Sequence, residues 1–253
     1  MTYKTDRLLL MIKHFISAVQ FITILPWGKG ESFDPPRMIP YFPIVGIVLG
    51  ILLALFDYVA VSFWGRTVGS LLDVVFLVLL TGAFHIDGLG DAADGLLGQR
   101  PKEKVLAIMK DSRLGTMGLV AIVAGLAIKW AGISGLNENR ALLLIVVPAY
   151  ARGGMLFGMC YLPYGRPDGG TGTDFFNQRI ELHAFRGLAV PVAISVFLGW
   201  QAIWLMICFA AITAALIRYY RRRLGGITGD MLGAMAEILE SGLFLLVSIG
   251  GAA

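Results

Sequence analysis

The sequence predicts an all-α membrane protein, a polytopic helical bundle of about seven transmembrane helices. Hydrophobic residues make up 57% of the 253 residues and charged residues only 15%, which leaves too little polar surface to cover a water-soluble globule. Apolar runs of about 18 residues or more recur along the chain. Lys and Arg cluster between these runs and give a formal net charge of +4, as expected of loops that face the cytoplasm and the anionic headgroups of a lipid bilayer. We expect a single integral membrane domain over residues 1–253 and no nucleic-acid partner.

The N-terminal run, Leu8 to Leu25, contains Lys13, His14 and Gln20 among its apolar residues. A run of this kind favours a helix that lies along the membrane interface over one that spans the bilayer. Farther along, five runs are each close to the ~20 residues that cross a hydrocarbon core of ~30 Å. They are Ile39–Phe56, Val68–Phe84, Gly115–Gly135, Ala141–Leu162 and Met231–Gly250.

The run from Leu188 to Ile217 has about 30 residues, which is long for one span. Trp200 and Gln201 interrupt it. The two most basic segments, Arg100–Arg113 and Arg218–Arg223, lie together in the cytoplasm only if this run crosses the bilayer twice. We therefore expect a helical hairpin here.

The stretch "AFHIDGLGDAADGLLGQR" places three aspartates directly after an apolar run. In a helix, Asp91 and Asp94 follow Asp87 at rotations of about +40° and −20° and at a rise of ~6 and ~10 Å, so all three share one stripe. Like charges on one face repel, and the helix gains nothing from them unless a cation lies between them. Carboxylates of this kind suit Mg²⁺ or Mn²⁺. The alternative, a solvated helix cap, explains one aspartate but not the stripe.

Polar residues at three other places in the sequence are candidates for the same site as this stripe. His85, just before it, either ligates the metal or hydrogen-bonds a phosphate or a backbone group. In "IMKDSRLGTMG", the residues Asp111, Ser112 and Arg113 stand at a helix entrance, where backbone N–H groups, a hydroxyl and a guanidinium can converge on an anion. Arg152 lies in the middle of a predicted span, where an ionised side chain usually faces a partner or a cavity. That partner is either a phosphate or one of the aspartates.

The stretch "LGGITGDMLGAMAEILE" places Asp230 and Glu237 seven residues apart on one helical face. The preceding Gly-Gly-x-Thr-Gly turn, with Gly225, Gly226 and Thr228, lets a backbone approach a ligand closely. It lacks the Lys of a P-loop. The polar, Gly-rich loop over residues 164–179 is either a plain connection or a substrate flap.

Together these features indicate phosphoryl transfer from a nucleotide-activated substrate. They are carboxylates for a divalent cation, arginines for phosphate and Gly-rich turns at a membrane surface. In such reactions the protein mainly positions the reacting groups and offsets charge. The motifs "FHIDGLGDAADGLLG", "IMKDSRLGTMG" and "GGITGDMLGAMAEILE", with "FITILP" and "YFPIVGIVLG" near the N-terminus, resemble those of the cobalamin synthase family. The resemblance covers nearly the whole chain.

The resemblance implies a Mg²⁺-dependent enzyme that joins adenosylcobinamide-GDP to α-ribazole or α-ribazole 5′-phosphate, releases GMP and yields adenosylcobalamin or its 5′-phosphate. It implies a multi-pass protein of the prokaryotic inner membrane, with its active site facing the cytoplasm. It leaves open a homo-oligomer or an association with other enzymes of cobalamin assembly.

The resemblance also assigns expected roles to residues of this chain. The expected metal ligands are Asp87, Asp91, Asp94 and Asp230. The resemblance implies phosphate contact for Arg113 and Arg152, and the motifs themselves add Asp111, Ser112, Gly225, Gly226 and Thr228 as expected substrate-binding residues. The expected catalytic residues are His85, Asp94 and Glu237, with His85 or Glu237 as the candidate base.

Two alternative functions fit part of this pattern. Lipid-making CDP-alcohol phosphotransferases also use an aspartate-rich membrane helix, but their pattern has an Ala-Arg pair after Asp-Gly that "DGLGDAADG" lacks. A cation transporter would use intramembrane carboxylates and Arg152 as an ion path. Carboxylates at helix ends beside basic segments argue against a transporter.

Overall fold

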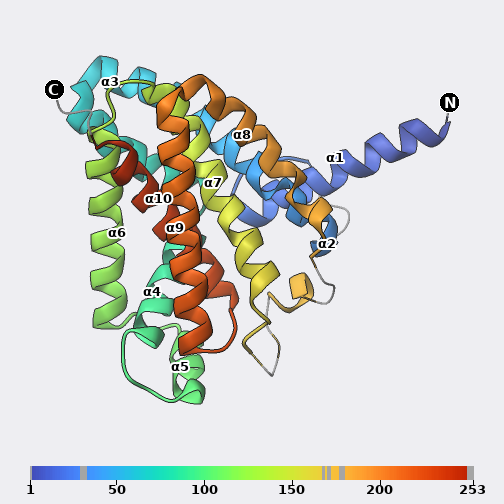
Figure 1. The fold of residues 1–253 in the computed structure, drawn as a ribbon. Helices are drawn as coiled ribbons and strands as arrows, with labels where there is room; N and C mark the ends of the chain where they lie inside the picture. Colours follow the sequence, from blue (N-terminus) through green and yellow to red (C-terminus); the bar gives the residue numbers. More distant parts are fainter. Residues whose placement is uncertain (1, 29–32, 167–168, 170–171, 177–179, 250–253) are drawn as a thin grey trace.

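A computed structural model describes residues 2–28, 33–166, 169, 172–176 and 180–249 as a bundle of helices (Figure 1). The predicted all-α membrane fold is confirmed. Among the described residues, four helical segments are long and apolar enough to cross a membrane, so the predicted count of seven is not confirmed. The four are Pro35–Leu80, Thr116–Ser134, Arg140–Tyr161 and Trp200–Arg223.

The first two predicted spans form the two arms of one broken helix, α3 (Phe42–Leu80). The break is at Gly65, where φ is 74° and ψ is 173°, a conformation that glycine adopts without a Cβ clash. The arms turn back on each other, and the rings of Phe56 and Phe76 stack with centroids 4.2 Å apart. Two short elements, α2 (Pro35–Met38) and the 3-10 helix η1 (Ile39–Tyr41), lead into α3.

Glycines let α3 pack closely against α7 (Arg140–Tyr161). A Cβ at Gly46 would lie 2.4 Å from the Ala149 Cα, and one at Gly50 would lie 2.3 Å from the Ile145 carbonyl oxygen. Such contact between backbones is typical of helices that associate in lipid, where packing rather than water exclusion draws helices together.

The central helix is α10 (Gly229–Val247), which packs against α4 (Phe84–Leu96), α6 (Thr116–Ser134), α7 and α9 (Trp200–Arg223). Its side chains Leu239, Leu243 and Phe244 are fully buried. A Cβ at Gly132 of α6 would lie 2.5 Å from the backbone nitrogen of Leu245. Buried on nearly all sides, α10 fixes the positions of the helices around it.

The run over residues 188–217 turns at Gly199, with φ 59° and ψ −129°. The 3-10 helix η3 (Leu182–Leu188), α8 (Ala189–Ser195) and the 3-10 helix η4 (Val196–Leu198) lead to this turn, and α9 leads away from it. Figure 1 shows α8 rising to the top of the bundle and α9 descending from it. The expected reversal is present, but only the α9 arm has the length of a span.

The N-terminal helix α1 (Thr2–Ile22) projects sideways from the bundle (Figure 1). Its segment from Leu8 to Ile12 is exposed, whereas Ala18, Val19 and Ile22 are buried. An apolar helix that leaves the bundle in this way has the arrangement expected of a helix along the membrane interface.

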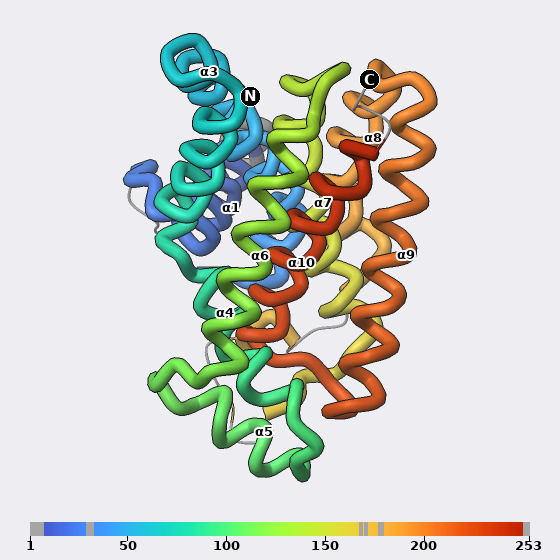
Figure 2. Tube along the Cα trace, turned by 90° about the vertical axis from the view of Figure 1, so that its left-hand side faces the viewer, coloured from blue at the N-terminus to red at the C-terminus, as the bar shows by residue number. Residues whose placement is uncertain are grey.

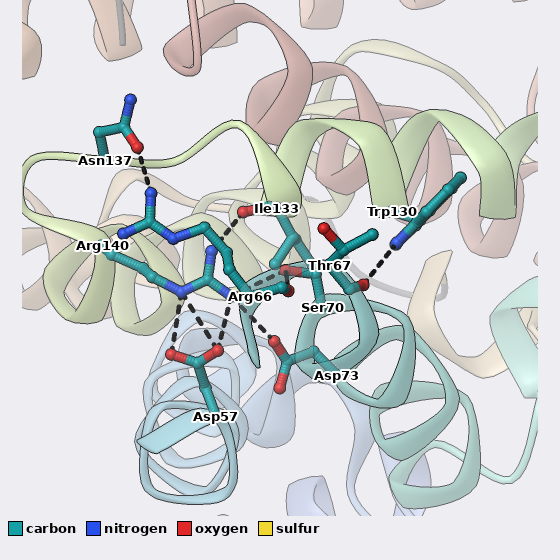
Figure 3. A network of polar contacts seen from close by, with 9 residues as sticks. All are labelled: Asp57, Arg66, Thr67, Ser70, Asp73, Trp130, Ile133, Asn137 and Arg140. Carbon is teal, nitrogen blue, oxygen red and sulfur yellow. Dashed lines mark hydrogen bonds and ion pairs between the residues drawn. The ribbon is translucent and has the colours of Figure 1, made fainter. Parts of the chain in front are cut away.

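The two ends of the bundle carry different polar groups. At one end, Figure 2 places α5 (Lys102–Met109) beside the C-terminal end of α9, and Arg223 Nη2 donates to the Leu96 carbonyl at 2.9 Å. The two basic segments therefore share this end. At the other end, near the turn of α3, Arg140 pairs with Asp57 at 2.5 Å and with Asp73 at 3.2 Å (Figure 3).

Candidate active site

The aspartate stripe lies on α4, a helix of 13 residues that is too short to cross a bilayer. The chain changes direction before α4 at Gly82 and Ala83, both with φ 58°. At Gly88, α4 meets the start of α10, and a Cβ there would lie 2.7 Å from the Asp230 carbonyl oxygen. This close approach brings the carboxylates of α4 next to that of Asp230.

Asp91 is the central carboxylate of this cluster. It is half-buried, whereas Asp87 is exposed. Burial raises the pKa of Asp91 to about 6, and the negative charges of Asp87, Asp230 and Asp94 add to that rise. Ionisation of Asp91 is therefore unfavourable, first because of burial and then because of the carboxylates around it, and a nearby positive charge would favour it.

The donor set fits a hard divalent cation. Asp87, Asp91 and Asp230 offer only carboxylate oxygens, and the cluster is open on the side of the exposed Asp87, which suits a Mg²⁺ ion that keeps several waters. Across the described part of the chain, no three His, Cys, Asp or Glu side chains converge closely enough to hold a metal by themselves. A cation here would thus take few protein ligands and complete its shell with water or substrate.

Asp94 faces a different neighbour. Its carboxylate accepts hydrogen bonds from the backbone N–H groups of Gly115, at 2.7 Å, and Gly118, at 2.8 Å. A Cβ at either glycine would lie 2.4 Å from a carboxylate oxygen of Asp94. The third aspartate of the stripe therefore caps the N-terminus of α6, where a negative charge is stabilising.

At the predicted anion site, the entrance to α6, carboxylates of the protein itself also accept the hydrogen bonds. The backbone N–H groups of this entrance face Asp94, and Arg113 binds Asp111 in a fork, through Nε at 2.9 Å and Nη2 at 2.6 Å. These hydrogen bonds lower the pKa of Asp111 to about 2. Arg113 and Ser112 are exposed. Residues 111–113 form an accessible polar loop beside the carboxylates.

His85, Arg152 and Glu237 lie together in a buried ion network. Lys129 Nζ contacts Glu237 at 2.6 Å and Glu240 at 2.7 Å. Arg152 pairs with Glu240, and its Nη2 lies 3.5 Å from His85 Nδ1. The partner of Arg152 is thus a glutamate, and not an aspartate of the stripe.

Sequence reasoning missed Lys129 and Glu240 in this network. The signal was present for Lys129, because a lysine inside the apolar run from Gly115 to Gly135 marks a buried partner. All five side chains of the network are at most 4% exposed. Two cations and two carboxylates balance each other, as a buried ion cluster requires.

The Gly-Gly-x-Thr-Gly turn supports the start of α10. Thr228 caps this helix by accepting the Met231 N–H at 3.3 Å. The same turn binds the segment after α7, because Gly165 N–H donates to the Ile227 carbonyl and Ile227 N–H donates to the Pro163 carbonyl, each at 2.9 Å. A Cβ at Gly226 would lie 2.7 Å from the Pro163 carbonyl oxygen, so Gly226 permits this contact, whereas Gly225, with φ 74°, serves the turn itself.

Arg166, which sequence reasoning also missed, enters the carboxylate cluster from this segment. Its Nη2 lies 2.5 Å from Asp230 Oδ2. Its signal was weak, because it stands in a polar loop where charge is common. Much of the Gly-rich loop over residues 164–179, expected to be either a plain connection or a substrate flap, lies outside the described residues (167–168, 170–171 and 177–179).

A family model described as cobalamin-5-phosphate synthase matches residues 14–248, a range that contains every site residue named above. The chain belongs to the cobalamin-5-phosphate synthase family. A protein of Thermoanaerobacter sp. named adenosylcobinamide-GDP ribazoletransferase is 35% identical over 94% of this chain and 98% of its own length. Proteins of the same name from Clostridium novyi and Geotalea daltonii are 34% and 35% identical, over 90% and 95% of this chain and 94% and 99% of their own lengths.

As a member of the cobalamin-5-phosphate synthase family, the protein is a transferase of cobalamin synthesis. No solved structure matches the chain. The family assignment agrees with the function class that the carboxylates, arginines and Gly-rich turns indicated from the sequence.

Proposed function

We propose that this protein joins adenosylcobinamide-GDP to α-ribazole or α-ribazole 5′-phosphate in a Mg²⁺-dependent reaction that releases GMP. The observation that carries this proposal is the carboxylate cluster of α4 and α10 at the end of the bundle that holds both basic segments. The names of the relatives supply the substrate class. By the positive-inside tendency, this end faces the cytoplasm, at the inner membrane of a prokaryotic cell.

In this proposal the Mg²⁺ would bind at the cluster of Asp87, Asp91 and Asp230, with one or two of these carboxylates as ligands and water or substrate completing its shell. When bound, the ion supplies positive charge that offsets the negative charge of the phosphate oxygens. A hydroxyl oxygen of the ribazole attacks the phosphorus bonded to the cobinamide, and the bond from that phosphorus to the bridging oxygen of GMP breaks. The protein's own residues mainly hold the two substrates in line and keep the cluster in place.

The other predicted residues take supporting roles in this proposal. Asp94 holds the start of α6 beside the cluster through its two N–H contacts. Exposed Arg113 is available to a substrate phosphate if it leaves Asp111. His85, Arg152 and Glu237 position α4 against α7 and α10 from within the buried network.

The test is a product assay with the purified protein in lipid nanodiscs. Adenosylcobinamide-GDP and α-ribazole 5′-phosphate are supplied with Mg²⁺ or with EDTA, and GMP and corrinoids are separated by chromatography. The proposal predicts GMP and the cobalamin product in equal amounts, only with Mg²⁺ and only with both substrates. Product formation in EDTA would contradict the Mg²⁺ requirement. Release of CMP from CDP-diacylglycerol, without GMP release, would support the lipid enzyme instead.

A further inference from the structure

Arg166 is the one described cation that contacts a carboxylate of the proposed metal cluster. The contact is an ion pair of 2.5 Å with Asp230, in which the side chains of Arg166 and Asp230 are 18% and 24% exposed. Its charge also acts on Asp91, where it opposes the effect of the three neighbouring carboxylates. Arg166 thus lies where it offsets part of the negative charge of the cluster.

The backbone holds Arg166 close to this position. The bridge between Tyr164 and Ile227 fixes the residues directly before it, through two hydrogen bonds of 2.9 Å. Ile227, which takes part in both bonds, stands three residues before Asp230, so the backbones of both partners of the ion pair lie next to this bridge. The Arg166 side chain can therefore change its conformation while its backbone stays beside the cluster.

The Arg166 guanidinium keeps an N–H donor for which no described residue supplies an acceptor. Within the described residues its contacts run through Nη2, to Asp230 and, at 3.4 Å, to the Met109 carbonyl. Its buried Nε has no acceptor there. An arginine carries five N–H donors in a planar fork that matches phosphate oxygens. A buried donor without an acceptor is costly, so this side chain is suited to receive an anionic ligand.

We propose that Arg166 and the divalent cation compete for Asp230, and that Arg166 grips the diphosphate of the nucleotide-activated substrate once the cation holds that carboxylate. This inference rests on the proposed function. The two positive groups repel each other when both approach Asp230, so binding of the cation weakens the ion pair. The guanidinium of Arg166, released from Asp230, can then donate hydrogen bonds to the phosphate oxygens of a substrate bound at the same place.

The experiment measures cation binding apart from turnover. Mn²⁺, which replaces Mg²⁺ at oxygen sites, is titrated into the substrate-free protein in nanodiscs and followed by its electron paramagnetic resonance signal. Arg166→Gln removes the competing charge, so Mn²⁺ should bind about threefold more tightly or better. In turnover assays the same variant should raise KM for the GDP-linked substrate about tenfold.

Four further variants sharpen the test: Arg166→Lys, Arg222→Gln, Asp230→Asn and the double variant Asp230→Asn/Arg166→Gln. Arg166→Lys keeps the charge but loses the fork, so it should raise KM and leave the Mn²⁺ affinity close to that of the unaltered protein. Arg222→Gln, an exposed arginine at the same end of the bundle, controls for the loss of one positive charge and should change neither quantity. In an Asp230→Asn background, Arg166→Gln should no longer tighten Mn²⁺ binding, because the contested carboxylate is gone.

The outcomes separate this inference from the proposed function. Unaltered protein that binds Mn²⁺ and releases GMP, beside Arg166→Gln with unchanged or weaker Mn²⁺ binding, contradicts the competition alone. An unchanged KM in Arg166→Gln contradicts the diphosphate contact. If the unaltered protein binds no Mn²⁺, the metal site of the proposed function fails, and this inference fails with it.

Discussion

Asp91 and Asp94 stand three residues apart on α4 but have opposite surroundings. Asp91 has three carboxylates near it, whereas both oxygens of Asp94 accept backbone N–H groups of α6. Asp94→Asn should therefore lower the metal-free stability by ~1–2 kcal/mol, through loss of a charged helix cap. Asp91→Asn should leave that stability unchanged or raise it, because like-charge repulsion is relieved. Chemical denaturation of Asp94→Asn and Asp91→Asn in EDTA measures the two free energies of unfolding. Equal decreases in the two variants would contradict this prediction.

The pH dependence of the metal-free protein follows from the same residue. Burial and its neighbours raise the pKa of Asp91 from 3.8 to about 6, so the folded state binds this proton more tightly than the unfolded state does. The resulting contribution to the free energy of unfolding is largest below pH 4 and is lost as the pH rises through 6. Denaturation in EDTA between pH 4 and 7 should show this decline, and Asp91→Asn should flatten it. A variant profile as steep as that of the unaltered protein would refute this assignment.

At the scale of single residues, the sequence could predict which side chains share a helix face but not what lies opposite that face. The rotation of 100° per residue places Asp87, Asp91 and Asp94 together. It says nothing of the start of α6, which only tertiary packing brings to Asp94. Arg152 illustrates the same limit, because its buried glutamate partner is 88 residues away in the chain.

At the scale of elements, the buried network joins α4, α6, α7 and α10 through charge. Lys129→Met leaves two carboxylates with one cation, and breaking a buried ion pair by removal of one partner costs ~3–5 kcal/mol. The double variant Lys129→Met/Glu237→Gln restores the balance of charge, so it should unfold at a higher denaturant concentration than Lys129→Met. Denaturation of the two variants in nanodiscs measures this difference. A double variant less stable than Lys129→Met would contradict a network held by charge balance.

The two places where the chain reverses, at Gly199 and at Gly65, show which features of the helices could be predicted from the sequence. The length of the apolar runs and the basic segments predicted a reversal within residues 188–217, and the chain turns at Gly199. The length of α8 was not predictable, because apolar composition alone does not separate a full span from a short helix at the bundle surface. In α3 the two spans were predicted from their lengths, while the tight turn at Gly65 depends on one glycine conformation.

At the scale of the whole molecule, the fold places the basic segments and the carboxylates at one end. Lys102 and Arg222 should both lie on the cytoplasmic side, and the exposed Glu138 at the other end should lie outside. The check is labelling of Lys102→Cys, Arg222→Cys and Glu138→Cys with an impermeant maleimide on intact cells, in a Cys160→Ser background because Cys160 is exposed. Only Glu138→Cys should react from outside. Labelling of Lys102→Cys or Arg222→Cys would overturn this orientation.

The most direct test of the carboxylate cluster as a metal site is the rate of GMP release against Mg²⁺ concentration, for the unaltered protein and Asp91→Asn. Loss of one of few anionic ligands should cost on the order of 3 kcal/mol, about a hundredfold in rate, and added Mg²⁺ should restore part of it. Asp34→Asn, which removes a half-buried carboxylate paired with Arg37 at the start of α2, should behave like the unaltered protein. If Asp91→Asn releases GMP as fast as the unaltered protein at low Mg²⁺, the cluster on α4 and α10 is not the metal site.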